Sequence, residues 1–255
     1  MTDHKPLITP VPEHLRSDPI SSPQASPMAA RIEAVRERIA RAEHRFGRTA
    51  GSVRLLAVSK KKPAMAIRQA SDVGQKAFGE NYVQEAVDKM AELDDMGIQW
   101  HFIGPIQANK TRAIANHFGW VHSVDRLRIA ERLHEQRSAD LPPLDICIQV
   151  NISGEATKSG LDLVHGGGEA LWDLALSMAD LSRIRLRGLM AIPAPSRDFA
   201  AQRMPFMALR EAFETLNDKG LSLDTLSMGM SDDMEAAIAE GATMVRIGTA
   251  IFGPR

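Results

Sequence analysis

Short apolar runs alternate with longer stretches of helical periodicity along most of this 255-residue chain. The short runs are rich in Val, Ile and Leu, which is typical of strands buried on both faces of a parallel sheet. They lie at 53–58, 76–78, 99–103, 120–122, 144–150, 184–190, 225–227 and 243–247. Between them, apolar residues recur three and four positions apart among charged ones, which predicts amphipathic helices. These helices are expected at 64–70, 82–93, 110–117, 126–136, 171–181, 205–216 and 232–239.

Eight strands that each precede a helix or a short terminal turn predict an α/β protein with a parallel sheet. Eight such units in about 230 residues favour a single closed (β/α)8 TIM barrel, and an open doubly wound sheet is the alternative. An extra N-terminal helix is predicted at 28–45, because Ile32, Val35 and Ile39 recur at helical spacing and Gly47 follows as a stop.

The first residues of the chain differ in composition from the rest. Residues 1–27 contain six of the 14 prolines and few large apolar side chains, so burial could not offset the entropy lost on ordering them. We therefore expect a flexible N-terminal extension at 1–27 and a barrel domain at 28–255.

In a (β/α)8 barrel the functional residues lie in the loops that follow the strands. Lys60 follows the first strand, and alternation places it on the same face as Leu56 and Val58. Partial burial and the neighbouring Lys61 and Lys62 would both favour its neutral amine, which can form a Schiff base with an aldehyde. The alternative is a solvated charge cluster that only ends the strand.

The loops after the seventh and eighth strands form a candidate anion site. Ser231 is expected to cap a helix that starts at Asp232, and Gly229 and Gly248 allow a close backbone approach. Barrels frequently bind a phosphate between these two loops, at the start of a short extra helix. The turn that begins with Gly248 and Thr249 could supply that helix.

Arg246 is expected to lie beside this anion site, although the aspartates next to Ser231 argue against an anion there unless they point to solvent. It shares a strand face with Met244, so we expect its side chain to enter the barrel mouth. The alternative is a simple ion pair with Glu240.

Composition excludes several functional classes. The 31 Lys and Arg residues against 32 Asp and Glu give no reason to expect nucleic acid or an anionic membrane as a partner. The single cysteine, Cys147, excludes an intramolecular disulfide and is expected to be a small core residue, and the eight histidines lack metal-ligand spacing. Because no apolar stretch approaches twenty residues and the N-terminus lacks the apolar core of a secretory signal, we expect a cytoplasmic protein.

Six segments between residue 28 and residue 255 resemble the pyridoxal phosphate homeostasis protein family: 55–63, 78–85, 100–110, 187–192, 227–233 and 246–249. The resemblance implies the barrel of the alanine racemase N-terminal domain, with pyridoxal 5'-phosphate (PLP) bound to Lys60 as an internal aldimine. It also implies an arginine facing the pyridine nitrogen, phosphate contacts, and a second lysine that handles related B6 vitamers or cofactor transfer. The residues expected at the cofactor are Lys60, Asn81, Lys158, Ser231, Arg246, Gly248 and Thr249.

This chain departs from the family pattern in two places. The extension before residue 28 is not part of the pattern, and Lys61 stands where close relatives carry threonine. Neither departure touches the matched cofactor residues, although Lys61 could compete as a modified amine.

We expect a carrier and regulator of PLP, with no catalytic residue and no metal site. Its expected ligands are PLP and related B6 vitamers, its candidate partners are apo forms of PLP enzymes, and we expect a monomer. A barrel that binds a phosphorylated metabolite without a cofactor is one alternative, but it gives Lys60 no role.

An amino-acid racemase that uses the same barrel and lysine is the main alternative. Racemisation needs a base on each face of the substrate, and in alanine racemases the second is a tyrosine from an additional β-domain. We expect this chain to lack that domain, since it ends eight residues after Ile247. Tyr82, its one tyrosine, and His101 are the candidates for a missed second base. Arg246 at the pyridine nitrogen would also weaken the ring as an electron sink.

Overall fold

The computed structural model describes Met1 and residues 26–154 and 159–254. Nearly all of the expected extension at 1–27 lies outside these residues, and so does Lys158.

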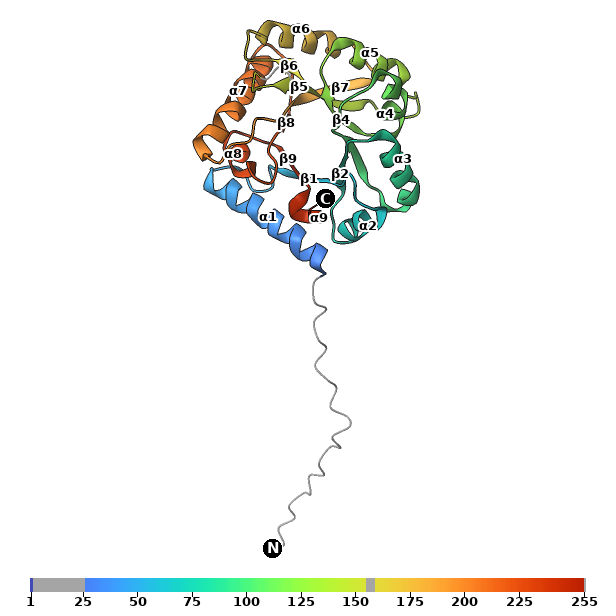
Figure 1. Ribbon diagram of the computed structural model, residues 1–255, viewed down its shortest axis with the longest axis vertical. Helices are drawn as coiled ribbons and strands as arrows, with labels where there is room; N and C mark the ends of the chain where they lie inside the picture. The colour runs from blue at the N-terminus through green and yellow to red at the C-terminus, as the bar shows by residue number, and fades with distance from the viewer. Residues whose placement is uncertain (2–25, 155–158, 255) are drawn as a thin grey trace.

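Eight parallel strands form a closed barrel (Figure 1). Each strand pairs with its neighbours, and the pairings of β9 with β1 and of β4 with β5 complete the ring. The predicted (β/α)8 barrel is therefore confirmed, and the open doubly wound alternative is wrong. The barrel strands are β1 (Arg54–Val58), β2 (Ala77–Glu80), β3 (Gln99–Phe102), β4 (Trp120–Val124), β5 (Leu144–Asn151), β7 (Ile184–Ala191), β8 (Thr225–Ser227) and β9 (Met244–Ile247).

A short strand, β6 (Leu161–Asp162), pairs with β5 outside the ring. The sequence pattern did not indicate it, because two residues are too few to show an alternation.

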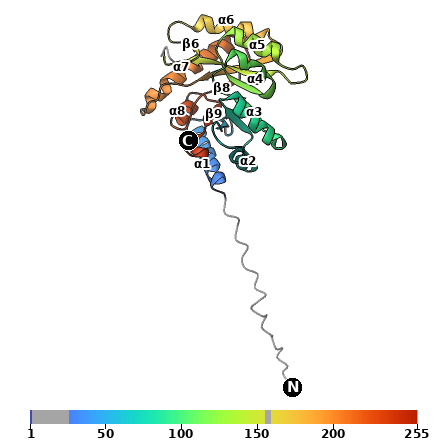
Figure 2. The same cartoon turned by 45° about the vertical axis from the view of Figure 1, so that its right-hand side comes forward.

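Helices surround the barrel in both views (Figures 1 and 2). They are α1 (Pro27–Arg45), α2 (Ala64–Asp72), α3 (Val83–Glu92), α4 (Thr111–His117), α5 (Leu127–Gln136), α6 (Gly168–Ala179), α7 (Phe199–Asp218), α8 (Met234–Ala239) and α9 (Thr249–Phe252), with 3-10 turns η2 (Asp94–Met96) and η3 (Ala108–Lys110). Helix α1 packs against α2, α8 and α9 through the apolar stripe that the sequence predicted. No helix in the described ranges is long and apolar enough to cross a membrane.

Helix α7 begins six residues before the predicted start at Pro205, which lies inside it. The Asp198 side chain caps the helix by accepting a hydrogen bond from the Ala201 N–H at 2.7 Å. The first turn is also held from outside, because the ring of Phe199 stacks on Phe46 with 6.1 Å between centroids. Capping and tertiary packing thus offset the hydrogen bond that a proline removes from a helix interior.

Helix α8 begins later than predicted, and Ser231 does not cap it. Its N-cap residue is Asp233, whose carboxylate accepts a hydrogen bond from the Met230 N–H at 2.6 Å. The Ser231 carbonyl instead accepts a hydrogen bond from Arg38 at 3.1 Å. Residues 231–233 therefore form a turn, which leaves the Ser231 hydroxyl outside the helix.

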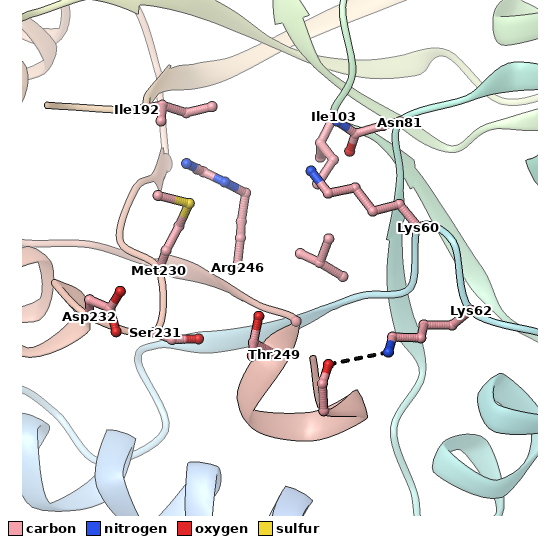
Figure 3. Close-up of a pocket in the computed structure, with 13 residues that line it drawn as sticks. Lys60, Lys62, Asn81, Ile103, Ile192, Met230, Ser231, Asp232, Arg246 and Thr249 are labelled. Carbon is pink, nitrogen blue, oxygen red and sulfur yellow. Dashed lines mark hydrogen bonds between the residues drawn. The ribbon is translucent and has the colours of Figure 1, made fainter. Parts of the chain in front are cut away.

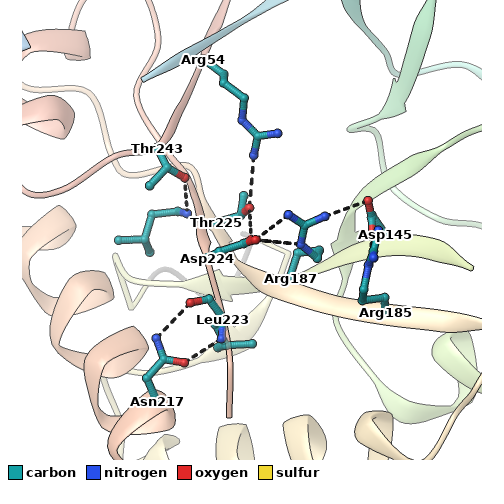
Figure 4. A network of polar contacts seen from close by, with 10 residues as sticks. Arg54, Asp145, Arg185, Arg187, Asn217, Leu223, Asp224, Thr225 and Thr243 are labelled. Atoms are coloured by element: carbon teal, nitrogen blue, oxygen red, sulfur yellow. Dashed lines mark hydrogen bonds and ion pairs between the residues drawn. The ribbon is translucent and has the colours of Figure 1, made fainter. Parts of the chain in front are cut away.

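A polar network that includes Arg187, Asp145 and Asp224 lies at the amino ends of the strands (Figure 4). Arg187 donates to Asp145 at 3.0 Å and to Asp224 at 3.0 and 3.1 Å. The guanidinium carbons of Arg187 and Arg54 lie 4.9 and 5.4 Å from the centroid of the Trp120 ring. Both distances allow a cation–π interaction. This network lies at one end of the barrel, and the pocket described below lies at the other.

Cys147 packs with Trp120 and Met190 in a small apolar cluster inside the barrel. It is fully buried and not in a disulfide, and burial raises the pKa of its thiol to about 12. The expectation of a small core residue is confirmed.

Candidate functional site

A pocket of about 250 Å³ lies at the carboxyl ends of the strands (Figure 3). It contains every predicted site residue that the structure describes, whereas Lys158 falls outside the described residues. Sequence reasoning did not single out the apolar lining residues Ile103 and Ile192. The lining residues are Val58, Lys60, Lys62, Asn81, Ile103, Ile192, Met230, Ser231, Asp232, Arg246, Gly248, Thr249 and Gly253.

Lys60 extends into this pocket from the end of β1, with its amine on the side of Asn81 and Ile103 (Figure 3). Val58 lines the same pocket, whereas Ser59 is fully buried and its hydroxyl donates to Glu80 at 2.7 Å. The strand alternation that the sequence predicted is thus confirmed: Lys60 faces the barrel mouth and its neighbour faces away.

A buried cluster behind β1 fixes the backbone at Ser59. The amine of Lys89 donates to the Ser59 carbonyl at 3.0 Å, to Glu80 at 2.7 Å and to Glu85 at 2.6 Å. Burial raises the pKa of Glu80, and the hydrogen bonds from Lys89 and Ser59 oppose that shift. Sequence reasoning missed this cluster, although the spacing of Glu85 and Lys89 is that of a helical ion pair.

Lys61 and Lys62 make contacts different from those expected of a solvated cluster. Lys61 has a φ of +61°, the one positive φ among the described non-glycine residues, and its amine lies 5.9 Å from the centroid of the Tyr82 ring. The amine of Lys62 donates to the carbonyls of 252–254 at 3.1, 3.2 and 2.8 Å. Lys62 therefore holds the end of α9, and the three lysines point to three different places.

Arg246 enters the pocket from β9, where it is paired in register with Leu56. One terminal nitrogen, Nη1, donates to the Ser227 carbonyl and, at 2.9 Å, to the Ser227 hydroxyl. The other, Nη2, donates to the Ala191 carbonyl at 2.9 Å. Burial lowers the pKa of Arg246 to about 10, so it remains a cation at neutral pH. The alternative ion pair is wrong, because Glu240 binds Arg203 and Arg210.

Ser231 and Thr249 place hydroxyl groups at one side of the pocket (Figure 3). Between the strand end and α9, a Cβ on Gly248 would lie 3.1 Å from the Val58 carbonyl oxygen, so the backbone passes close to the strand. Gly229 has a φ of +92°, and a Cβ there would lie 2.6 Å from that of Ala237. Gly229 is therefore required by its loop, and Gly248 allows the close backbone approach that the sequence predicted.

Asn81 supplies a buried acceptor to the pocket. Its Oδ1 has no hydrogen-bond partner among the described residues. A buried polar atom without a partner is costly, and a ligand group that donates a hydrogen bond would satisfy it. The pocket thus combines an amine, a buried cation, two hydroxyls and an open acceptor with apolar walls.

The chain is similar to proteins of one known family. The family model "Alanine racemase, N-terminal domain" matches residues 31–255. The pyridoxal phosphate homeostasis protein of Pseudomonas aeruginosa is 59% identical over 90% of this chain and 96% of its own, and that of Escherichia coli K12 is 54% identical over 89% and 97%.

Among solved structures, PipY of Synechococcus elongatus with PLP bound superposes with a TM-score of 0.78. It is 37% identical, and the match covers 89% of this chain and 100% of PipY. The chain therefore belongs to the pyridoxal phosphate homeostasis protein family, which shares the barrel of the alanine racemase N-terminal domain.

Proposed function

We propose that this protein binds PLP in the barrel-mouth pocket and takes part in PLP homeostasis, holding the cofactor on Lys60 without substantial catalytic turnover. The observation that carries the proposal is the meeting of Lys60, Arg246 and the Ser231 and Thr249 hydroxyls in one pocket. Two kinds of relative support it: proteins named for PLP homeostasis at 54 and 59% identity, and PipY, whose structure contains PLP.

The pocket residues fit the functional groups of PLP. When bound, PLP supplies an aldehyde that condenses with amines and a pyridine ring that can withdraw electrons. Lys60 would form the Schiff base with that aldehyde. Ser231, Thr249 and the backbone at Gly248 would donate hydrogen bonds to the phosphate, as expected for an anion at a helix start. The open Oδ1 of Asn81 would accept a hydrogen bond from the ring hydroxyl.

Arg246 supports a carrier rather than a catalyst. It stays protonated at neutral pH and has only hydrogen-bond donors. Facing the pyridine nitrogen, it would keep that nitrogen unprotonated and so weaken the ring as an electron sink. The candidates for a second base give little support to a racemase: Tyr82 lies beside Lys61, and His101 is buried with a pKa that burial lowers to about 3.

Schiff-base formation is tested by mixing the protein with PLP, recording the visible spectrum, and reducing with borohydride. Peptide mapping should then find the pyridoxyl mass on Lys60. The Lys60→Arg variant should lose the adduct, whereas Lys61→Arg and Lys158→Arg, as controls, should keep it. An adduct found only on Lys61, Lys62 or Lys158 would refute the assignment.

The homeostatic role is tested by transfer of the cofactor. We propose that the protein, acting as a monomer, releases PLP to apo forms of PLP enzymes. Incubating the loaded protein with such an apoenzyme should restore its activity, and light scattering on the same sample gives the mass of the donor. If activity returns no faster than with an equal concentration of free PLP, direct transfer is contradicted.

A further inference from the structure

A chain of four buried polar side chains crosses the barrel interior from the pocket. The Ser227 hydroxyl lies 2.9 Å from Nη1 of Arg246 and 2.8 Å from Nδ1 of His122. Nε2 of His122 lies 2.9 Å from Nδ1 of His101. Each of the four residues is at most 4% exposed, and they come from β9, β8, β4 and β3. The proposed function uses only Arg246.

Both histidines are neutral in this setting. Burial lowers the pKa of His101 to about 3 and that of His122 well below its ordinary value, and nearby cationic arginines act in the same direction. A neutral imidazole carries one N–H and one acceptor nitrogen. The direction of each hydrogen bond can therefore be worked out by counting donors and acceptors.

The count favours one direction. Arg246 can only donate, so the Ser227 oxygen accepts from it. If Ser227 then donates to His122, and His122 to His101, only the Nε2–H of His101 lacks a partner. The reverse direction leaves two groups without partners, the Ser227 O–H and the His101 Nε2 lone pair. Nε2 of His101 is buried and unpartnered among the described residues in either direction, so the two directions differ by the Ser227 O–H, and a single unsatisfied group costs less than two.

This direction of the hydrogen bonds fixes which N–H groups of Arg246 remain available to a ligand. Because the Ser227 proton is committed to His122, the Ser227 oxygen faces Arg246 as an acceptor. The described contacts use three of the five N–H groups of Arg246, two on Nη1 and one on Nη2. One N–H of Nη2 and that of Nε are left for the pocket. The guanidinium is thus oriented before any ligand arrives, which lowers the cost of binding.

We propose that Ser227, His122 and His101 are positioning residues for Arg246, and that this one-way hydrogen-bond chain makes the pocket selective for ligands whose ring carries an acceptor nitrogen. The inference rests on the proposed PLP-binding function. The first test below needs no cofactor and the second does, so a failure of this inference can be told apart from a failure of the proposed function.

The first test needs no cofactor. Nitrogen-15 NMR of the ligand-free protein should show His101 and His122 as neutral Nε2–H tautomers between about pH 6 and pH 8. The Ser227→Ala variant removes the donor to Nδ1, so His122 should populate the Nδ1–H tautomer. A wild-type protein with His122 protonated, or carrying its proton on Nδ1, would overturn the proposal even if PLP binds.

The second test compares PLP with its 1-deaza analogue, in which a C–H replaces the ring nitrogen. Ser227→Ala and His122→Phe should weaken PLP binding roughly tenfold, the loss expected from a misplaced charged hydrogen bond. Binding of the deaza analogue should change by less than about twofold. The matched control is Ser123→Ala, which removes a buried hydroxyl that is not part of the hydrogen-bond chain. It should change the affinity for both ligands equally.

Equal losses for PLP and the analogue in Ser227→Ala would mean that Ser227 only supports the fold, and would overturn the proposal. If the wild-type protein does not bind PLP, the proposed function fails. The histidine tautomers measured by NMR then decide whether the hydrogen-bond chain runs in the inferred direction.

Discussion

Glu80 and Lys89 form a buried ion pair, with 2.7 Å between Oε1 and Nζ, directly behind the end of the strand that carries Lys60. Lys89 also donates to the Ser59 carbonyl, so the pair is bonded to the residue that precedes Lys60. Lys61, the residue that follows Lys60, has a positive φ, and its backbone N–H donates to Glu85 at 2.5 Å. The direction of Lys60 thus depends on residues that do not line the pocket.

Replacing Lys89 by methionine should lower the free energy of unfolding by about 3 kcal/mol, because Glu80 would be left as a buried charge without its partner. Formation of the PLP adduct on Lys60 should slow in the same variant. Urea denaturation and stopped-flow absorbance measure the two effects. Lys76→Met, on an exposed lysine, is the control and should change stability by less than about 0.5 kcal/mol. Equal stability of both variants would show that the buried pair contributes nothing.

The double variant Ser231→Ala, Thr249→Ala should weaken PLP binding at least tenfold, because each hydroxyl that donates to a charged acceptor contributes about 1.5 to 3 kcal/mol. Fluorescence titration gives the dissociation constant. Thr215→Ala removes a hydroxyl from the exposed face of α7 and should leave binding unchanged. Wild-type affinity in the double variant would place the phosphate elsewhere.

The PLP-loaded protein should not invert amino acids at ordinary enzyme rates, on the order of 1 per second or faster. Arg246 at the ring nitrogen would disfavour the electron withdrawal that inversion requires. Incubation with L- and D-amino acids in deuterated water, followed by NMR and chiral chromatography, measures exchange and inversion separately. Slow exchange by Lys60 alone is compatible with the proposal, whereas rapid inversion contradicts it and makes Tyr82 and His101 the first residues to mutate.

Stability should fall as the pH is lowered below the ordinary histidine pKa of about 6.5. The pKa values of His101 and His122 are lowered in the folded protein, so in this range the unfolded chain binds protons that the folded protein does not. Each histidine should contribute a slope that approaches about 1.4 kcal/mol per pH unit below the ordinary pKa, until the pH nears its folded pKa, which is about 3 for His101.

The raised pKa of Glu80 acts in the opposite direction, so the total slope alone does not isolate the histidines. Urea denaturation of His101→Gln across the same pH range should give a shallower slope than the wild type. The exposed His44 is the control, and His44→Gln should leave the slope unchanged. A wild-type slope in His101→Gln would mean that His101 is protonated in the folded protein.

Arg187→Ala should lower the free energy of unfolding by about 2 kcal/mol, because it removes a cation shared by Asp145, Asp224 and the Trp120 ring. Arg185→Ala is a close control: its side chain is 61% exposed and pairs with the same Asp145. Exposed ion pairs contribute less than about 1 kcal/mol. Thermal denaturation compares the two variants, and an equal loss in both would contradict a special role for Arg187.

Local patterns determined the order of the elements and the directions of some side chains. Strand alternation placed Lys60 on the face of Val58, and the pocket contains both, because alternation depends only on the chain itself. The starts of α7 and α8 were misplaced because they depend on contacts from elsewhere. Phe46 stacks on Phe199 at one helix, and Arg38 donates to the Ser231 carbonyl just before the other.

Only the closed barrel decided which polar residues became buried partners. His101 and Arg246 are 145 positions apart in the sequence, yet two intervening side chains connect them across the interior. A single strand's pattern shows which residues share a face, but it does not give the register between strands or which strands lie opposite one another. Those relationships arise when β4 pairs with β5 and β9 with β1, because closure is what brings the inward faces of distant strands together.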